Sequence, residues 1–416
     1  MPQPARLAGV RVLLSDGSGL TARQTATALA LQGHEVHALA AGSLPLTRFT
    51  RHVRHVHRVA PYGTDPERWL TDALRISDEH RIDLLFPTQE QAFLLSRATD
   101  RIRAAGLRTV VPPFPAIRRV QDKVGAVQAL DEYSVLQPRS VVARSEAELL
   151  ATERLPVWVK PAIGTASTGV ERVETREDLE RVATRLERDG TLGRTGVVVQ
   201  DHQPGELVMV QTVFDRGRLV AFHANRRVRV GQRGGASVKE SVALPELREP
   251  LVRLGAGLEW HGALSFDAVV GPDGPLVIDV NPRLVEPGNA RRSGTDLVGV
   301  LVRLAGDEAV DALPDGRPGV RTHQLLIGVL GAAEQDGRRR DVLAELLSGT
   351  LHRGDYHAST EELTPVKGDP RAVVPLIAVG AATLVWPGAA RWFGSGAVAG
   401  YALTTDAWEQ IIDDAR

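Results

Sequence analysis

The sequence predicts a mixed α/β and α+β fold in three parts: a leading doubly wound parallel α/β domain, a β-rich middle region and a mainly helical C-terminal region. The first part alternates strand-like and helix-like segments, which is typical of a parallel sheet covered by helices on both faces. The middle part has long apolar runs joined by turn residues, and helix and loop patterns dominate after about residue 310. The 416 residues suffice for two or three domains, which we place at 1–112, 113–310 and 311–416.

The composition narrows the class of protein. Hydrophobic residues make up 43% of the chain and charged residues 24%, and the net charge is -1. These are ordinary globular values, and they argue against a nucleic-acid partner. Without cysteine, the chain has no disulfide, thiolate nucleophile or cysteine metal site. The N-terminus lacks the long apolar core of a signal peptide, so we expect a cytoplasmic protein.

The leading part opens with a strand, a helix that Gly33 ends, and a second strand. We expect strands at 10–15, 35–39, 81–88 and 109–113, and helices at 21–32, at about 66–80 and after Gln89. The first turn, "SDGSGLTA", matches the G-x-G-x-x-A pattern of NAD(P)-dependent Rossmann proteins. That fingerprint also needs an acid at the end of the second strand, and none follows Val36.

In the middle part we expect a helix at 123–132, helix–strand units over 145–188, a strand at 196–200, a strand pair over 205–230 that turns at 215–217, and strands at 263–270 and 276–281.

The C-terminal part contains nineteen uncharged residues, 372–390. Pro375 and Pro387 argue against a membrane span. We expect 372–392 to be buried or to form a homodimer interface, with contact to a membrane surface as the alternative.

Two acidic residues should face each other across a hairpin in "ALSFDAVVGPDGPLVIDVNPR". If Val270 lies opposite Leu276 across the turn cluster, Asp267 lies opposite Asp279, and two like charges in that position repel. Mg²⁺ would offset the repulsion, because it prefers oxygen ligands. Asn281 follows on the same face and Arg283 comes next, where it could neutralise a phosphoryl group. A solvent-facing polar edge is the alternative.

A second group of residues predicts a phosphate site. Lysine occurs only four times, and Lys160 ends the strand "VWVKP" before the small-residue loop "AIGTASTG". Backbone N–H groups near Gly164, with the hydroxyls of Ser167 and Thr168, could hold an anion. The order differs from a Walker A motif, since the lysine precedes the glycines. A flexible surface loop is the alternative.

Taken in order, "DK" at 122–123, "VKPAIGTASTG", "VVVQDHQPGE", "FDAVV" and "IDVNPR" resemble the ATP-grasp superfamily of carboxylate-amine ligases, over roughly residues 5–310. The resemblance implies a Rossmann-like leading domain and a two-subdomain ATP-grasp fold whose small lid spans about 140–200. It implies that Lys123 and Lys160 contact ATP phosphates under the 164–169 loop. It also implies a hinge formed by Gln200, Asp201, His202 and Gln203 that reads adenine, with Glu206 at the ribose.

The resemblance further implies Mg²⁺, or Mn²⁺ in its place, on Asp267, Asp279 and Asn281, with Lys160 and Arg283 as catalytic residues. The family more often has glutamates as metal ligands and an acid where Gln200 stands. Substrate contacts should come from the segments around this core, because arginine grips carboxylates in bidentate fashion. The expected substrate-binding residues are Arg226, Arg229, Gly234, Gly235, Lys239, Asn289 and Arg291.

The implied reaction joins a small-molecule carboxylic acid to an amine. ATP would convert the acid to an acyl phosphate, the amine would displace phosphate, and ADP and phosphate would be released. No protein nucleophile is needed, which agrees with the missing cysteine. The alternatives are an ATP-grasp enzyme that uses bicarbonate or a non-amine acceptor, a non-catalytic nucleotide-binding protein, and an NAD(P)-dependent Rossmann protein.

Overall fold

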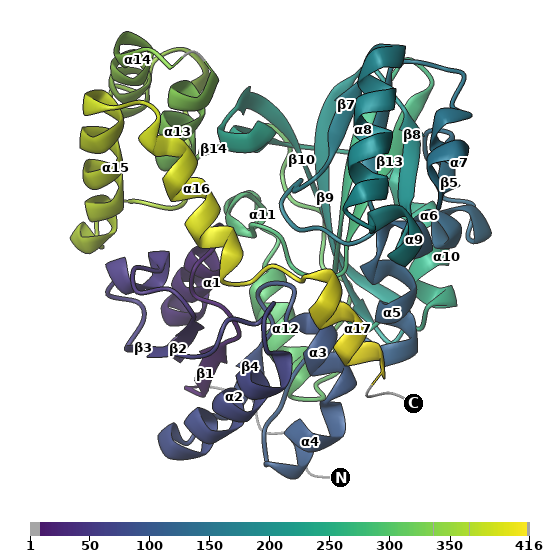
Figure 1. Ribbon diagram of the computed structural model, residues 1–416. Coiled ribbons are helices and arrows are strands. Elements are labelled where there is room, and N and C mark those ends of the chain that lie inside the picture. Colours follow the sequence, from purple (N-terminus) through teal and green to yellow (C-terminus); the bar gives the residue numbers. More distant parts are fainter. Residues whose placement is uncertain (1–8, 336, 366, 414–416) are drawn as a thin grey trace.

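Figure 1 shows the computed structural model of the protein, which describes residues 9–335, 337–365 and 367–413. Residues 1–8 of the predicted leading domain, and residues 336, 366 and 414–416 of the predicted C-terminal part, lie outside this description. The described residues form a four-stranded sheet, a seven-stranded sheet and a second four-stranded sheet.

The leading part forms a parallel sheet with the strand order β3-β2-β1-β4, as its alternating pattern predicts. Its strands are β1 (Arg11–Leu14), β2 (Glu35–Ala40), β3 (His55–Arg58) and β4 (Leu84–Phe86). Strand β3 was not predicted, and the strand predicted at 109–113 is wrong: only Arg108 makes a bridge, to Leu84. The two prolines of "TVVPP" cannot donate the hydrogen bonds of a ladder.

Helices cover both faces of this sheet. Leu13 of β1 packs into a core that contains residues of α2 (Pro66–His80) and α3 (Ala92–Arg97). Its neighbours Val12 and Leu14 point the other way, into a core that contains residues of α1 (Leu20–Leu31) and α12 (Leu297–Ala305). The predicted doubly wound arrangement is therefore confirmed. Because α12 follows the middle strands in sequence, the leading and middle parts share a core.

The middle part is built on the seven-stranded sheet, whose order is β13-β12-β9-β10-β11-β14-β15. Neighbouring strands are antiparallel except β14 and β15. The strands are β9 (Glu206–Asp215), β10 (Arg218–Val230), β11 (Ala236–Val242), β12 (Gly262–Gly271), β13 (Gly274–Asn281), β14 (Arg321–His323) and β15 (Thr360–Glu361). The predicted turn at 215–217 joins β9 to β10. Helix α10 (Arg248–Gly257) packs Leu251 and Leu254 into the same core as Phe214 and Phe222.

The second four-stranded sheet is antiparallel, with the order β5-β8-β6-β7. It consists of β5 (Ser140–Ala143), β6 (Val157–Pro161), β7 (Glu171–Val173) and β8 (Val197–Asp201). Together with α7 (Glu146–Leu150) and α8 (Arg176–Arg188) it has a core of its own, and Figure 1 shows these elements at the upper right. Helices α5 (Phe114–Gln121) and α6 (Lys123–Glu132) lead into it.

The C-terminal part is mainly helical, as predicted. It comprises α13 (Leu325–Gln335), α14 (Arg339–Thr350), α15 (Val373–Val385), α16 (Ala389–Ala399) and α17 (Thr405–Asp413). Figure 1 shows α13 to α16 as a block above the leading part, whereas α17 lies lower, where Ala407 and Ile411 join the core that contains Trp69 of α2. The domain boundaries at 112 and 310 stay a prediction.

The segment 372–392, which is uncharged up to residue 390, lies in two short helices broken at Trp386 to Gly388. Along the described chain, no helix combines the length and the apolar character needed to cross a membrane. One side of the segment is buried through Val379, Thr383 and Ala390, whereas Ile377 and Trp386 are 63% and 65% exposed. The expectation of a buried segment thus holds for one face only, and the homodimer and the membrane-surface contact stay predictions.

Candidate functional site

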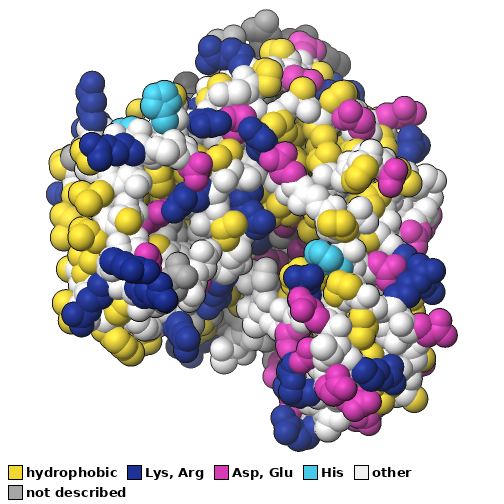
Figure 2. All heavy atoms as spheres, turned by 90° about the horizontal axis from the view of Figure 1, so that it is seen from above, with side chains coloured by type: hydrophobic (Ala, Val, Ile, Leu, Met, Phe, Trp, Pro, Cys, Tyr) yellow, Lys and Arg dark blue, Asp and Glu magenta, His cyan; other side chains and the backbone are white. Residues whose placement is uncertain are grey.

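A cavity of about 1210 Å³ lies where the two antiparallel sheets, the leading sheet and the C-terminal helices meet. Figure 2 looks down on this region and shows a hollow between the lobe of C-terminal helices, with hydrophobic side chains along its outer edge, and the lobe of the small sheet. Most of the predicted site residues line this cavity, as do residues of the leading part such as Gly19 and Glu90.

The predicted acidic pair lies on the wall formed by the β12–β13 hairpin. Asp267 is directly opposite Asp279, and Asn281 lines the same cavity. The detailed register differs from the prediction, because Val269 and not Val270 lies opposite Leu276. A β-bulge at Ile278 adds one residue to β13 and restores the facing pair. The pair was thus predicted from a register that is off by one.

The electrostatics of this pair favour a bound cation or a bound proton. No side chain or backbone group of the described residues forms a hydrogen bond or ion pair with either carboxylate. Burial, and next the charge of Asp279, raise the pKa of Asp267 to about 7, although Lys160 and Arg283 oppose the shift. Two close carboxylates without partners are costly unless a cation or a proton balances them.

Lys160 connects the two antiparallel sheets. It ends β6, and its Nζ donates to Gln200 Oε1 of β8 at 2.8 Å and to the carbonyl oxygen of Ile278 at 2.7 Å. Burial lowers the pKa of Lys160, while the charge of Asp279 opposes this shift. The ammonium group therefore lies beside the acidic pair in the cavity wall. An anionic ligand bound there would replace part of the solvation that the Lys160 ammonium group loses on burial.

Lys123 begins α6 and donates from Nζ to the carbonyl oxygen of Gly164 at 3.3 Å. The loop after Lys160 lines the cavity through Gly164 and Ser167, but Thr168 is exposed outside the lining. Ser167 has a left-handed backbone with φ of 59°, followed by Gly169 at 76°. Such turns point successive N–H groups to one side, as anion-binding loops do.

The predicted hinge also lies at the cavity. Gln200, Asp201, His202 and Gln203 all line it at the end of β8. Trp158 of β6, which the sequence did not single out, lines it as well and donates from Nε1 to His202 Nδ1 at 3.2 Å. Glu206 does not line it, since its carboxylate accepts from Arg226 Nη1 at 3.0 Å. Side chains alternate along β9, so Leu207 takes the cavity side.

This region matches a known family. Residues 120–287 match the model of the ATP-grasp domain. The chain contains an ATP-grasp domain. A curated relative is the urea amidolyase of Saccharomyces cerevisiae, which is 29% identical over 292 residues. That alignment covers 64% of this chain but only 16% of the yeast protein, so the chain spans a small part of the length of this relative.

Solved structures share the fold at low sequence identity. The N5-carboxyaminoimidazole synthetase of Staphylococcus aureus superposes with a TM-score of 0.62 at 12% identity, over 85% of this chain and 88% of that one. The biotin carboxylase of Campylobacter jejuni, in complex with β,γ-ATP, gives a TM-score of 0.60 at 17% identity, over 75% of this chain and 74% of that one. The fold of the ATP-grasp domain and its flanking parts is therefore shared with these enzymes.

Arg283 follows the ATP-grasp strand β13 and lines the cavity. Its Nε donates to Glu90 Oε1 at 3.0 Å, and Gln121 Nε2 donates to the other oxygen of Glu90 at 3.0 Å. Burial lowers the pKa of Arg283, but the charge of Glu90 and its hydrogen bond, together with the charges of Tyr401 and Asp267, more than offset this and the net shift is upward. Sequence reasoning missed Glu90, although it follows β4 at the sheet edge where parallel folds place their sites.

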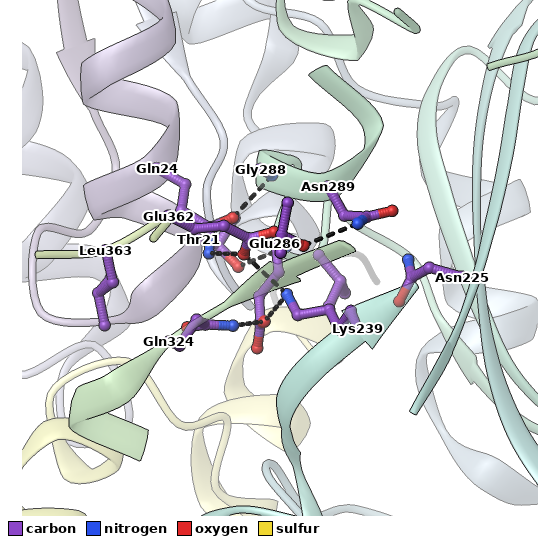
Figure 3. Close-up of polar contacts among 12 residues, drawn as sticks. Thr21, Gln24, Asn225, Lys239, Glu286, Gly288, Asn289, Gln324, Glu362 and Leu363 are labelled. Atoms are coloured by element: carbon purple, nitrogen blue, oxygen red, sulfur yellow. Dashed lines mark hydrogen bonds and ion pairs between the residues drawn. The ribbon is translucent and has the colours of Figure 1, made fainter. Parts of the chain in front are cut away.

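Lys239 lies in a buried polar network, drawn in Figure 3. Its Nζ donates to Glu286 Oε2 at 2.6 Å and to Glu362 Oε2 at 3.0 Å. The two carboxylates outweigh the cost of burial and raise the pKa of Lys239. Gln24 of α1 donates to Glu362 as well, at 3.0 Å. This network connects β11 to the leading and C-terminal parts. Lys239 lines the cavity, but the carboxylates of Glu286 and Glu362 already neutralise its charge.

The other predicted substrate residues divide between the cavity and its surroundings. Gly234 and Gly235 line the cavity, whereas Arg226, Arg229, Asn289 and Arg291 do not. Arg226 pairs with Glu240, and Arg229 pairs with Glu345 and Asp355. Asn289 is fully buried and contacts His223 and Thr322. Besides Arg283, Arg227 of β10 and Arg233 in the connection from β10 to β11 line the cavity.

The glycine turn after β1 closes the cavity on the leading side. A Cβ atom on Gly17 would lie 2.3 Å from Thr47 Oγ1, and one on Gly19 would lie 2.5 Å from Gln89 Nε2. Packing therefore favours glycine at position 17 independently of any dinucleotide, since Ala38 Cβ and the Leu39 carbonyl oxygen also lie close, at 3.0 and 3.2 Å, whereas at position 19 only the end of the Gln89 side chain would have to move. Ser18, Gly19, Leu20 and Thr21 bring the N-terminus of α1 to the cavity wall.

Proposed function

We propose that this protein is an ATP- and Mg²⁺-dependent carbon–nitrogen ligase, which activates a small carboxylic acid as an acyl phosphate and joins it to an amine. The observation that carries the proposal is the facing pair Asp267 and Asp279 beside Lys160 in one cavity, a pair to which none of the described residues donates a hydrogen bond. Such a pair suits a hard divalent cation together with phosphate oxygens.

The residues present fit Mg²⁺, since Asp267, Asp279 and Asn281 supply only oxygen donors. Mn²⁺ would suit the same donors. Bound Mg²⁺ would neutralise charge on the phosphate oxygens during transfer. Lys123, Lys160 and the 164–169 loop would hold the phosphates, and the 200–203 hinge with Trp158 would hold the base. Solved neighbours carry such ligands: the 2-oxoglutarate carboxylase domain of Hydrogenobacter thermophilus was solved with MgADP and bicarbonate.

The reaction needs positioned charge more than a protein nucleophile. The substrate carboxylate would attack the γ-phosphorus of ATP, which forms the acyl–oxygen–phosphorus bond and releases ADP. The amine would then attack the acyl carbon, and phosphate would leave through a tetrahedral intermediate. Arg283, held by Glu90, would face the oxyanion of that intermediate, where positioned donors contribute most.

The shape of the cavity supports a substrate with an apolar group. The leading and C-terminal parts contribute aliphatic and aromatic side chains to the cavity lining, among them Leu46, Phe49, Ile327, Leu330, Val379 and Phe393. The N-terminus of α1 offers N–H groups to an anionic end of the same substrate. We therefore expect an acid or amine with an apolar side chain to react faster than its small polar analogue.

A second candidate is an ATP-grasp enzyme that uses bicarbonate as its acid. The biotin carboxylases and N5-carboxyaminoimidazole synthetases among the structural neighbours favour it, because their names denote carboxylation. Bicarbonate is itself a small carboxylate, so the same phosphate and metal contacts would serve both candidates.

One experiment tests the proposal and separates the candidates. ADP formation is measured with pairs of acids and amines, in bicarbonate-free buffer and with bicarbonate added. With the productive acid labelled by ¹⁸O in its carboxylate, the released phosphate should carry one label, because the acyl phosphate passes that oxygen to phosphorus. ADP formation that requires bicarbonate would select the second candidate. Release of AMP, or unlabelled phosphate, would contradict activation by phosphoryl transfer.

A further inference from the structure

Four of the twelve histidines gather on the leading sheet, away from the ATP-grasp cavity. His37 lies on β2, His55 and His57 lie on β3, and His80 is the last residue of α2. β3 is the edge strand and runs parallel to β2, with His37 in register with His55 and Leu39 with His57. Because side chains alternate along a strand, His55 and His57 share one face.

Three of these rings converge. Ligand nitrogens of His37, His57 and His80 all lie within 4.8 Å of one another. His37 Nδ1 and His57 Nε2 are 2.9 Å apart, and the ring centroids of His57 and His80 are separated by 4.4 Å. Three imidazoles whose nitrogens face one point form a donor set typical of zinc and of other late first-row divalent ions.

A carboxylate orients the buried member of this set. His37 Nε2 lies 3.2 Å from Glu35 Oε1, so the ring can donate there and keep its Nδ1 lone pair for the shared point. Metal-binding histidines commonly donate their second ring N–H to a carboxylate in this way. His80 ends a 15-residue helix, and the C-terminus of a helix favours a nearby positive charge.

We propose that His37, His57 and His80 form a binding site for a divalent transition metal, filled best by Zn²⁺, with water as the fourth ligand. The ligands come from β2, β3 and α2, so the bound ion would hold the edge strand β3 to its neighbours. This site is separate from the Mg²⁺ site, whose donors are oxygen atoms. Its role is structural, and it does not depend on the reaction catalysed in the cavity.

Metal content of the untagged full chain tests the site. Protein stripped with a chelator is dialysed against ZnCl₂ in excess Mg²⁺, and bound zinc is measured by mass spectrometry. We expect one zinc ion per chain, a higher melting temperature, and the visible absorption of tetrahedral Co²⁺ when cobalt replaces zinc. His57→Gln and His80→Gln should each weaken zinc binding at least tenfold, and Glu35→Gln should weaken it roughly tenfold.

Two control variants locate the bound ion. Asp279→Asn changes the acidic pair and His357→Gln changes an exposed histidine elsewhere, so both should keep the zinc. Zinc that is lost in Asp279→Asn and kept in His57→Gln would place the ion in the cavity and overturn the proposal. Wild-type protein that takes up no zinc would overturn it as well. Circular dichroism of the unliganded variants checks that each one folds.

Discussion

The side chain of Lys160 donates to the carbonyl oxygen of Ile278 across 2.7 Å, and this contact joins the two antiparallel sheets at the cavity. Ile278 is the extra residue of a β-bulge, so its carbonyl lacks a partner in the ladder with β12. One local irregularity therefore sets Asp267 opposite Asp279 and also supplies an acceptor that holds the lysine beside them. The bulge thus determines how β12 and β13 pair and, through that pairing, where the charges of Asp267, Asp279 and Lys160 lie.

Lys160→Met should weaken ATP binding by roughly 10- to 100-fold, because a charge-assisted hydrogen bond is worth about 1.5–3 kcal/mol. Methionine has a similar length and fits a buried position without charge. Lys367→Ala changes an exposed lysine and serves as the matched control. Equilibrium binding of a fluorescent ATP analogue measures both variants, and equal affinities would refute the phosphate contact.

Asp279→Asn should lower the rate of ADP formation by about 100-fold or more, since it removes one of two charges that hold the cation. The melting temperature should not fall, because the change relieves repulsion between neighbouring carboxylates. Asp273→Asn, in the exposed turn of the same hairpin, controls for surface charge. A variant at Asp279 with normal turnover would rule out the proposed metal site.

Glu90→Gln should reduce kcat and leave the KM for ATP nearly unchanged, because Glu90 holds Arg283, which the proposed reaction places at the acyl group. Arg283→Lys should lose a similar factor, and the double variant should lose little more than either single one. Glu67→Gln breaks an exposed ion pair with Arg101 in the same leading part and should have little effect. Fully additive losses would show that the two residues act independently.

Asp16 should make the stability of the protein depend on pH. Its carboxylate accepts from the N–H groups of Ser18 at 2.8 Å and Gly19 at 3.1 Å, yet burial raises its pKa from 3.8 to about 6. The folded state thus keeps a proton that the unfolded state releases near pH 4. The stabilising contribution of that proton is present at low pH and is lost as pH rises through about 6.

Asp16→Asn removes this dependence, because asparagine can accept the same hydrogen bonds and does not ionise. Relative to wild type, the variant should gain roughly 1–2 kcal/mol of unfolding free energy between about pH 5 and pH 7.5. Urea denaturation at the two pH values measures the difference. A difference in stability that stays constant with pH would mean that Asp16 ionises as freely in the folded state as in the unfolded one.

Sequence reasoning found the segments of the site more reliably than the side chains. The run 223–241 was expected to contact substrate, but it is Arg227 that lines the cavity, whereas Arg226 turns to Glu240. Glu206, the acid nearest to the expected ribose position, points away from the cavity, and Leu207 lies at the wall. Which side of a strand faces the cavity depends on its partner strands, and a shift by one residue reverses the assignment.

Some features of the fold and of the site could be predicted from the sequence alone. Periodicity fixed the parallel leading sheet, and turn residues fixed the hairpin that carries Asp267 and Asp279, because local patterns decide which segments become strands and which strands pair next to each other in the chain. Tertiary packing alone decided that Glu90 meets Arg283, that Glu362 neutralises Lys239, and that histidines from β2, β3 and α2 converge. Those partners are far apart along the chain, and only the way the sheets and helices pack brings them together.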